Sequence, residues 1–143
     1  MNLMRAGRTL RYHTWTVHHR ENVAEHTFNV MGIYLERYGP MSPEVSTYIL
    51  LHDVAEVVTG DMPFIMKRKY PVLKLVMDDA EADTLTEMGL ELPTVSTEEL
   101  YKIKICDLLS MKFYAEAEIA MGNEAMQEVV DNINDAVEKM QND

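Results

Sequence analysis

Four residues in this sequence, two histidines and two aspartates, are of types that bind divalent cations. His52 and Asp53 stand side by side in an apolar run. A carboxylate buried in such surroundings costs several kcal/mol unless a cation or hydrogen bonds compensate it. His26 precedes this pair, and Asp107 lies in a second apolar run further along. Together they form a mixed nitrogen and oxygen ligand set, which suits Mn²⁺, Fe²⁺, Co²⁺, Ni²⁺ or Zn²⁺ and leaves positions open for water and substrate.

Glu56 follows Asp53 by three residues and His52 by four. On a helix this spacing places all three side chains on one face, so the sequence directs three ionisable groups toward one spot. A simpler interpretation exists for each residue alone. An isolated His-Asp pair is more often a buried ion-pair network, and an isolated His26 is more often a core histidine with its hydrogen bonds satisfied. The joint presence of all four candidate ligands favours a metal site.

The elements that would position these residues are helices, since the apolar spacing is helical and almost no alternating strand pattern is present. We expect a single domain over residues 1–143, an all-α bundle of five or six helices that includes a short one before Arg11. The gap from Arg11 to Asn22 has no helical periodicity, and loops of that length often serve a site. The longer helices are expected over Val23 to Tyr38, from Ser42 through Val58 to Gly60, Pro71 to Met88, Ser96 to Met121, and Glu124 to Met140.

Composition limits the classes of partner. Hydrophobic residues make up 47% of the 143 residues and charged residues 26%, which suits a folded core. The formal net charge of -11 disfavours nucleic acid polymers and anionic membranes as partners. We see no signal peptide and no membrane segment, and we expect a cytoplasmic protein. The single cysteine, Cys106, excludes an internal disulfide and a cysteine-based zinc site, and its apolar neighbours indicate a buried structural thiol.

Longer strings around the candidate ligands are more specific than the ligands alone. The order His26, His52-Asp53, Asp107 resembles the HD-domain phosphohydrolase superfamily. The strings from Arg20 to His26 and from His52 to Pro63, followed by Lys67, resemble its deoxynucleotide-hydrolysing branch, which includes bacterial 5'-deoxynucleotidases and short phage dATP triphosphohydrolases. The resemblance covers roughly residues 8 to 123. The chain is shorter than usual members, mainly between Leu90 and Thr97 and at the C-terminus.

The resemblance implies roles for the residues that match. The four metal ligands would be His26, His52, Asp53 and Asp107, and a metal there supplies hydroxide near neutral pH. Glu56 matches the catalytic acid/base, although it could instead only orient His52 from outside the ligand set.

Six further residues match or extend the substrate-binding positions of this branch. Arg11 would contact a phosphate or a base edge, and Tyr12 would pack against the sugar and exclude a 2'-hydroxyl. Tyr12 departs from the commoner tryptophan at this position, so selection for the deoxy sugar is less firmly implied. Asp61 matches a carboxylate that binds the 3'-hydroxyl, with a turn cap as the alternative. Lys67 matches a phosphate-contacting lysine, and Arg20 could add a second positive charge beside it. Among the histidines of the loop, His19 is the best candidate for a substrate contact.

The function implied is divalent-metal-dependent hydrolysis of 2'-deoxynucleotide phosphates. The basic Lys67-Arg68-Lys69 run and the histidine-rich loop favour a dNTP, best dATP, triphosphohydrolase that releases triphosphate. The alternatives are a 5'-deoxynucleotidase acting on monophosphates and a non-catalytic nucleotide- or metal-binding module. The expected cofactor is Co, Mn, Zn, Ni or Fe, with room for Mg²⁺ at an additional site on the substrate phosphates. A homo-oligomer is expected, because a chain this short would gain from the extra burial.

Overall fold

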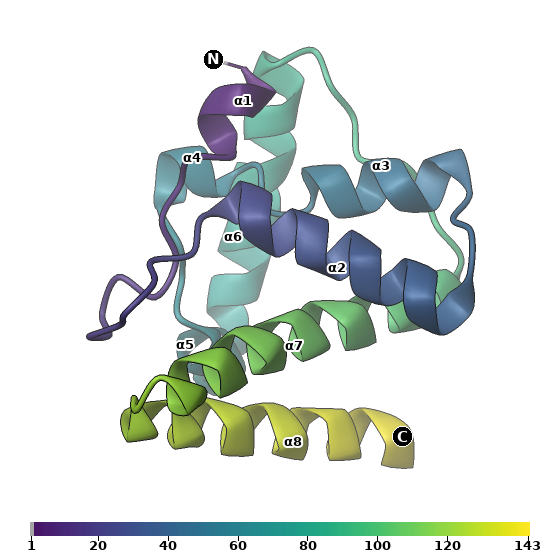
Figure 1. Cartoon of the computed structure of the whole chain (residues 1–143). Helices are drawn as coiled ribbons and strands as arrows, with labels where there is room; N and C mark the ends of the chain where they lie inside the picture. The colour runs from purple at the N-terminus through teal and green to yellow at the C-terminus, as the bar shows by residue number, and fades with distance from the viewer. Residues whose placement is uncertain (1) are drawn as a thin grey trace.

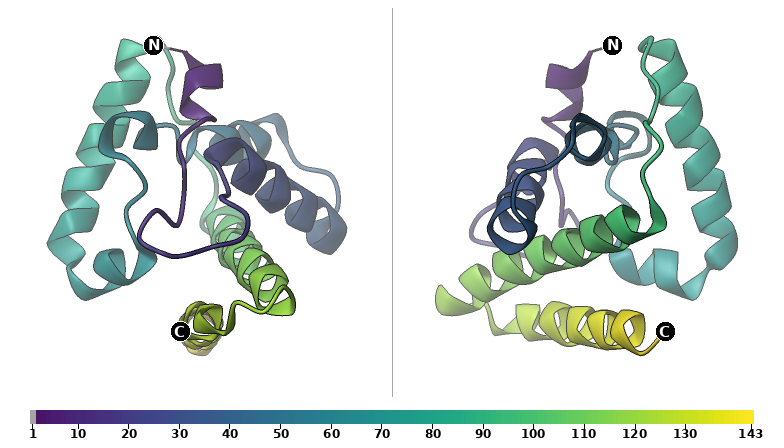
Figure 2. Two further views of the ribbon diagram at one scale, coloured as in Figure 1. Left: turned by 60° about the vertical axis from the view of Figure 1, so that its left-hand side comes forward. Right: turned by 90° about the vertical axis from the view of Figure 1, so that its right-hand side faces the viewer.

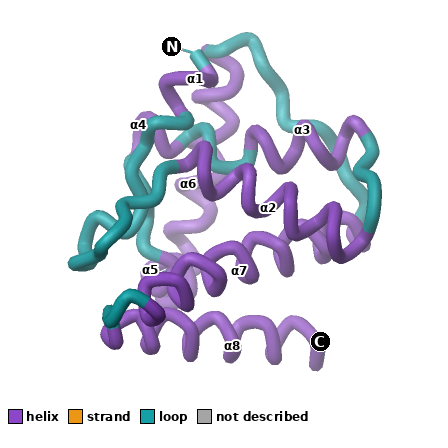
Figure 3. The backbone as a smooth tube through the Cα atoms, in the orientation of Figure 1, coloured by secondary structure: helices purple, strands orange, loops and turns teal. Residues whose placement is uncertain are grey.

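The computed structural model describes residues 2–143, and helices are its only regular elements over these residues, which confirms the predicted all-α class (Figures 1 and 3). Within these residues the only β-type pairing is an isolated antiparallel bridge between Leu10 and Asn22. More helices are present than the five or six expected: the short helix before Arg11 is present as α1, but the helix expected from Ser42 to Gly60 is divided into α3 and α4, and the short α5 is additional. The elements are α1 (Leu3–Ala6), α2 (Val23–Tyr38), α3 (Pro43–Leu51), α4 (Glu56–Thr59), α5 (Phe64–Lys69), α6 (Pro71–Glu87), α7 (Thr97–Ala120), the 3₁₀ turn η1 (Glu124–Met126) and α8 (Gln127–Asn142).

Side-chain caps fix the starts of three helices. The Asn22 side chain accepts from the backbone N–H of Glu25 at the start of α2, and Ser42 does the same for Val45 in α3. Ser96 and Glu99 form a reciprocal capping box at the start of α7. Such caps satisfy backbone donors that have no partner within the helix. The predicted starts near residues 42 and 96 are therefore confirmed.

The expected continuous helix from Ser42 to Val58 is wrong. The chain leaves α3 at Leu51, passes through a turn, and becomes helical again only at Glu56. Tight i→i+3 bonds span this turn, including Val54 N–H to Leu51 O at 3.2 Å and Glu56 N–H to Asp53 O at 3.1 Å. His52 also donates through Nδ1 to the backbone carbonyl of Ile49, which offers that carbonyl a side-chain partner. His52 and Asp53 consequently lie in a turn between two helices.

Helix α7 is the centre of the arrangement. It runs beside α8 along much of its length and is crossed by α2 on its other side (Figures 1 and 2). Ile103 and Cys106 face the α2–α3 side, where Val30 and Ile49 complete a core. Met111 and neighbouring residues face α8 in a second core. Cys106 is buried as predicted, and burial raises the pKa of its thiol to about 11.

Residues 11–21 form a closed loop beside α7, as the missing periodicity predicted. The Leu10–Asn22 bridge joins its ends, with Arg11 N–H donating to Glu21 O at 2.9 Å. Within the loop, the N–H groups of His18 and His19 donate to the buried carboxylate of Glu118 in α7, at 2.7 Å and 3.2 Å. The loop is thus closed by the bridge between its ends and anchored to α7 by Glu118.

No helix in the described part of the chain is long and apolar enough to cross a lipid bilayer.

Candidate metal centre

Four side chains from three separate parts of the chain meet at one point. His26 comes from the first turns of α2, His52 and Asp53 from the turn after α3, and Asp107 from the middle of α7. Each offers one ligand atom, and these atoms all lie within 4.8 Å of one another. His26 Nε2 is 2.6 Å from Asp107 Oδ1, and His52 Nε2 is 3.1 Å from Asp53 Oδ2. The sequence-predicted ligands are therefore brought together.

The far nitrogen of each imidazole is occupied by a neighbour, which aims the near nitrogen at the centre. His26 Nδ1 lies 3.1 Å from Ser110 Oγ, a fully buried hydroxyl one turn after Asp107 on α7. His52 Nδ1 donates to the carbonyl of Ile49. In the neutral ring, that bond fixes the tautomer in which His52 Nε2 carries the lone pair. Metal-binding histidines are commonly oriented in this way by outer partners.

The buried charges of the cluster influence each other strongly. Burial alone would lower the pKa of His52, but Asp53 and Asp107 raise it well above its ordinary value. Burial alone would raise the pKa of Asp53, yet His52 together with Arg11 and His26 lowers it. A cluster of this kind holds a proton among its members, and a cation must displace that proton to bind.

The donor set fits a divalent transition-metal ion. His52 Nε2 is a buried nitrogen without a hydrogen-bond partner, and two carboxylate oxygens stand beside it. Imidazole nitrogen and carboxylate oxygen together suit Mn, Fe, Co, Ni or Zn, and four protein ligands leave coordination positions for water or substrate. The geometry gives no preference among these ions.

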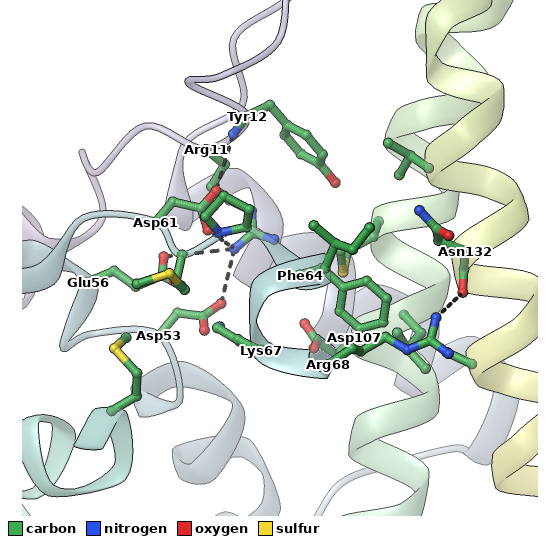
Figure 4. Close-up of a pocket in the computed structure, with 18 of the residues that line it drawn as sticks. Arg11, Tyr12, Asp53, Glu56, Asp61, Phe64, Lys67, Arg68, Asp107 and Asn132 are labelled. Atoms are coloured by element: carbon green, nitrogen blue, oxygen red, sulfur yellow. Dashed lines mark hydrogen bonds and ion pairs between the residues drawn. The ribbon is translucent and has the colours of Figure 1, made fainter. Parts of the chain in front are cut away.

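Arg11 is the counter-ion of the acidic groups around the centre, with only 6% of its surface exposed. Its guanidinium lies 3.3 Å from Glu21, 3.5 Å from Asp53, 3.7 Å from Asp61 and 3.8 Å from Glu56. Burial disfavours its charge, but the surrounding carboxylates raise its pKa above the ordinary value. The sequence-based interpretation placed Arg11 against substrate, whereas its guanidinium is directed at these carboxylates (Figure 4).

Glu56 is buried beside the cluster, with 4% of its surface exposed and no hydrogen-bond partner for Oε2. Burial is the main cause that raises its pKa to about 9, and the negative charge of Asp53 adds to the effect. Arg11 and Lys67 act in the opposite direction. A carboxyl group in this position can donate or accept a proton near neutral pH once a cation lowers its pKa.

A cavity of about 560 Å³ opens from the cluster, within the range of small-molecule sites at about 300–1,000 Å³. Its walls include His52, Asp53 and Asp107 of the cluster, and residues of α8 line it as well. Six of the 13 lysines and arginines of the chain line it, against seven of the 24 acidic residues. The lining is thus nearly balanced in charge although the protein is strongly acidic, and a divalent cation at the cluster would make it net positive, which favours an anionic ligand. The six cations are Arg11, Lys67, Arg68, Lys74, Lys104 and Lys139.

The predicted substrate residues divide into two groups. Arg11, Tyr12, Asp61 and Lys67 all line the cavity. Asp61 Oδ2 also accepts from the backbone N–H of Tyr12 at 3.2 Å, so it joins the loop to the segment after α4.

His19 and Arg20 do not line the cavity. The ring of His19 is largely exposed and lies 2.6 Å from Glu25, while Arg20 donates to the backbone carbonyl of Tyr12. Their contacts brace the loop.

Three residues important to this region were not identified from the sequence. Ser110 orients His26, Glu118 anchors the loop, and Lys104 adds a cation one turn before Asp107. Lys104 and Ser110 follow from the helical spacing around Asp107, a signal that the sequence does carry. Glu118 stands 99 and 100 positions from its partners, and no local pattern links them.

The sequence matches the HD domain family over residues 5–141, and the chain therefore belongs to that family. Members of this family are generally hydrolases that use a divalent metal, in keeping with the His and Asp cluster.

Two solved structures from archaea share the fold. A protein of Pyrococcus horikoshii has 21% sequence identity and a TM-score of 0.64, with 97% of this chain and 86% of that chain covered. A conserved hypothetical protein of Pyrococcus furiosus has 18% identity and a TM-score of 0.57, with 97% and 95% covered. At these identities the likeness concerns the fold alone. A comparison with curated proteins finds none that matches.

Proposed function

We propose that this protein is a divalent-metal-dependent phosphohydrolase that acts on 2'-deoxynucleotides, with dNTP as the preferred substrate and dATP the best candidate. The observation that carries the proposal is the cluster of His26, His52, Asp53 and Asp107 at the end of a cation-lined cavity. The deoxynucleotide assignment comes from the resemblance of the strings around His26 and His52. The cavity supports it by offering positive charge next to apolar walls.

The four ligands would hold the cation. When bound, it would supply Lewis-acid activation of water and neutralise charge on the phosphoryl oxygens. Glu56 lies next to the ligands and would take the proton of the attacking water and return it to the leaving oxygen. Arg11 holds Glu56 and Asp53 in place through their carboxylates. The buried guanidinium of Arg11, placed between these two carboxylates, limits the freedom of both acidic side chains.

Unpaired lysines favour a triphosphate over a monophosphate. The lysines that form ion pairs in the described chain are Lys74, Lys102 and Lys112. Lys67, Lys104 and Lys139 line the cavity without a carboxylate within ion-pair distance among the described residues. A triphosphate carries more charge than a monophosphate and needs more cationic partners. An additional Mg²⁺ on the substrate phosphates would serve the same need.

A 5'-deoxynucleotidase acting on dNMPs is the second candidate. It is favoured by the approach of four acidic residues to Arg11, which lowers the positive charge close to the cluster. Both candidates use the same ligands and the same Glu56, and they differ in the phosphate bond that is broken.

Product analysis distinguishes the candidates. The protein is loaded with Mn²⁺ or Co²⁺ and incubated with dNMP, dNTP and NTP panels, and the phosphate products are separated by ion exchange. We expect deoxynucleoside and inorganic triphosphate from dNTPs, and slower reaction with NTPs. Release of inorganic phosphate from dNMPs alone would favour the second candidate. Absence of any phosphate product with every metal tested would overturn the proposal.

A further inference from the structure

The cavity that opens from the metal cluster also has an aromatic and apolar part, whose side chains belong to one hydrophobic cluster. Phe64 from α5, Trp15 from the closed loop, Met111 from α7 and Met140 from α8 all line it. Charged phosphates would gain nothing from these side chains, whereas a flat heteroaromatic ring stacks favourably on the two aromatic rings and packs against the methionines. The cavity therefore offers cationic side chains for phosphates and an apolar part suited to a nucleobase. We call the part lined by Phe64, Trp15, Met111 and Met140 the aromatic compartment.

Two polar groups enter the aromatic compartment from opposite sides. Tyr12 has 8% of its surface exposed, and its hydroxyl is buried without a hydrogen-bond partner. The Asn132 side chain comes from α8, and Figure 4 shows its amide and the Tyr12 hydroxyl both directed into the cavity above the Phe64 ring. A buried hydroxyl without a partner costs stability, and a ligand atom that bonds to it removes the penalty. The compartment thus contains an apolar stacking surface and two groups that can form hydrogen bonds.

The side chains around the compartment are held in place by contacts with one another and with neighbouring elements. Arg68 donates from Nη1 to the backbone carbonyl of Asn132 at 3.3 Å, and its guanidinium carbon lies 5.6 Å from the centre of the Phe64 ring. One side chain therefore ties α5 to α8. On the opposite side, the Tyr12 ring stacks on Tyr114 with centres 4.3 Å apart and planes 17° from parallel. Positions fixed in this way can discriminate between ligands that differ by a single polar atom.

We propose that the aromatic compartment binds the nucleobase and that Asn132 reads the edge of the base, with adenine preferred over guanine. This inference rests on the proposed deoxynucleotide hydrolysis. The Asn132 amide offers a donor and an acceptor side by side, and adenine presents the complementary acceptor and donor at N7 and N6. Guanine presents two acceptors at the same edge, so the amide can satisfy only one of them. Tyr12 bonds a polar atom of the nucleoside and adds affinity for all bases.

The test uses two variants on the same helix with the same charge change. Asn132→Asp replaces the amide donor by a carboxylate oxygen, which accepts only, so the variant can no longer donate to N7 of adenine. A guanine turned in the compartment can instead present its other edge, where the adjacent N1–H and N2–H donors pair with the two carboxylate oxygens. Asn134→Asp is the matched control, because Asn134 is exposed on α8 and lies outside the cavity. For each protein, kcat/KM is measured with the four deoxynucleotides of whichever phosphate class the wild type hydrolyses.

We expect the wild type to prefer adenine and Asn132→Asp to lower the adenine-to-guanine ratio of kcat/KM by roughly 10- to 100-fold, corresponding to about 1.4–2.8 kcal/mol. Asn134→Asp should leave the ratio unchanged. Asn132→Ala is a second substitution at the same position, and it should lose the preference for adenine without gaining activity on guanine. Tyr12→Phe should lower kcat/KM for every base while the number of metal ions bound stays the same.

The outcomes separate this inference from the function on which it rests. Equal activity on all bases, or an unchanged ratio in both Asn132 variants, would overturn the role of Asn132 while the deoxynucleotide activity stands. Failure of the wild type to hydrolyse any nucleotide would overturn both.

Discussion

Glu56 carries the strongest constraint on the chemistry at the scale of single residues. Its carboxyl group is buried among Asp53, Asp61 and Arg11, and burial is the main reason that its pKa rises to about 9. Without a cation it is protonated at neutral pH. A divalent cation a few ångströms away favours the charged form, and this would bring the pKa toward the range where a general base works best.

Glu56→Gln should keep the metal and lose turnover. The amide has nearly the same shape as the carboxyl group, but it cannot accept a proton from water, so kcat should fall by about 10²–10⁴-fold. Metal content is measured by elemental analysis alongside phosphate release. Loss of the metal in this variant would assign Glu56 to the ligand set and contradict its role as the acid/base.

The raised pKa of Glu56 also predicts how the stability of the metal-free protein depends on pH, and the same substitution tests it. The pKa of Glu56 in the folded protein is about 9, above the ordinary value of 4.5, so the folded state keeps a proton that the unfolded chain releases. The stabilisation is complete below about pH 4.5 and is lost as the pH rises toward 9. Glu56→Gln removes this loss.

Thermal melts from pH 5 to pH 9 in the presence of a chelator check the expectation. The melting temperature of the variant should rise relative to wild type as the pH increases. A difference that stays constant over this range would contradict the burial of an ionisable group at this position.

Residue types in the sequence were enough to predict that His26, His52, Asp53 and Asp107 meet as candidate ligands, since a histidine and a carboxylate seldom occur together in an apolar run without a partner. The orientation of the imidazoles could not be predicted in the same way. It depends on Ser110 and on the carbonyl of Ile49, which become partners only after α2, α3 and α7 have packed. The sequence predicts His19 and Arg20 at the substrate because it shows charge but not direction, and in the structure their side chains contact Glu25 and the backbone of Tyr12.

Helix α7 combines three tasks at the scale of elements. It supplies Asp107 to the cluster, Ser110 to His26, and Glu118 to the closed loop that carries Arg11 and Tyr12. Its periodicity and its capping box made its length predictable. The break between α3 and α4 was not predictable, because the apolar residues around His52 continue the helical spacing while the turn depends on local side-chain and i→i+3 bonds.

Glu118→Ala should destabilise the protein by about 2–3 kcal/mol, because two loop N–H groups would lose a charged acceptor. Chemical denaturation measures the change. Glu116→Ala is the control on the same helix, since Glu116 is exposed and forms only a loose ion pair with Lys112 at 3.9 Å. The control should cost about 0.5 kcal/mol or less. Equal effects of the two substitutions would show that Glu118 does not hold the loop.

At the scale of the whole molecule, the cluster joins segments that lie far apart in the sequence. His26 and Asp107 are 81 positions apart, and the turn with His52 and Asp53 lies between them. A cation at this point would therefore link α2, the α3–α4 turn and α7. It would stabilise the folded state, because the unfolded chain has no comparable site for it. The order of these residues was visible in the sequence, but their convergence required the helix packing.

Calorimetric titration of the metal-free protein with Mn²⁺, for wild type, Asp53→Ala and Asp79→Ala, tests the metal centre most directly. Asp79 is an exposed residue of α6 outside the cluster and serves as the matched control. Wild type and Asp79→Ala should each bind one tight ion per chain, and Asp53→Ala should bind none. Tight binding that survives in Asp53→Ala, or its absence in wild type, would contradict a metal centre formed by His26, His52, Asp53 and Asp107.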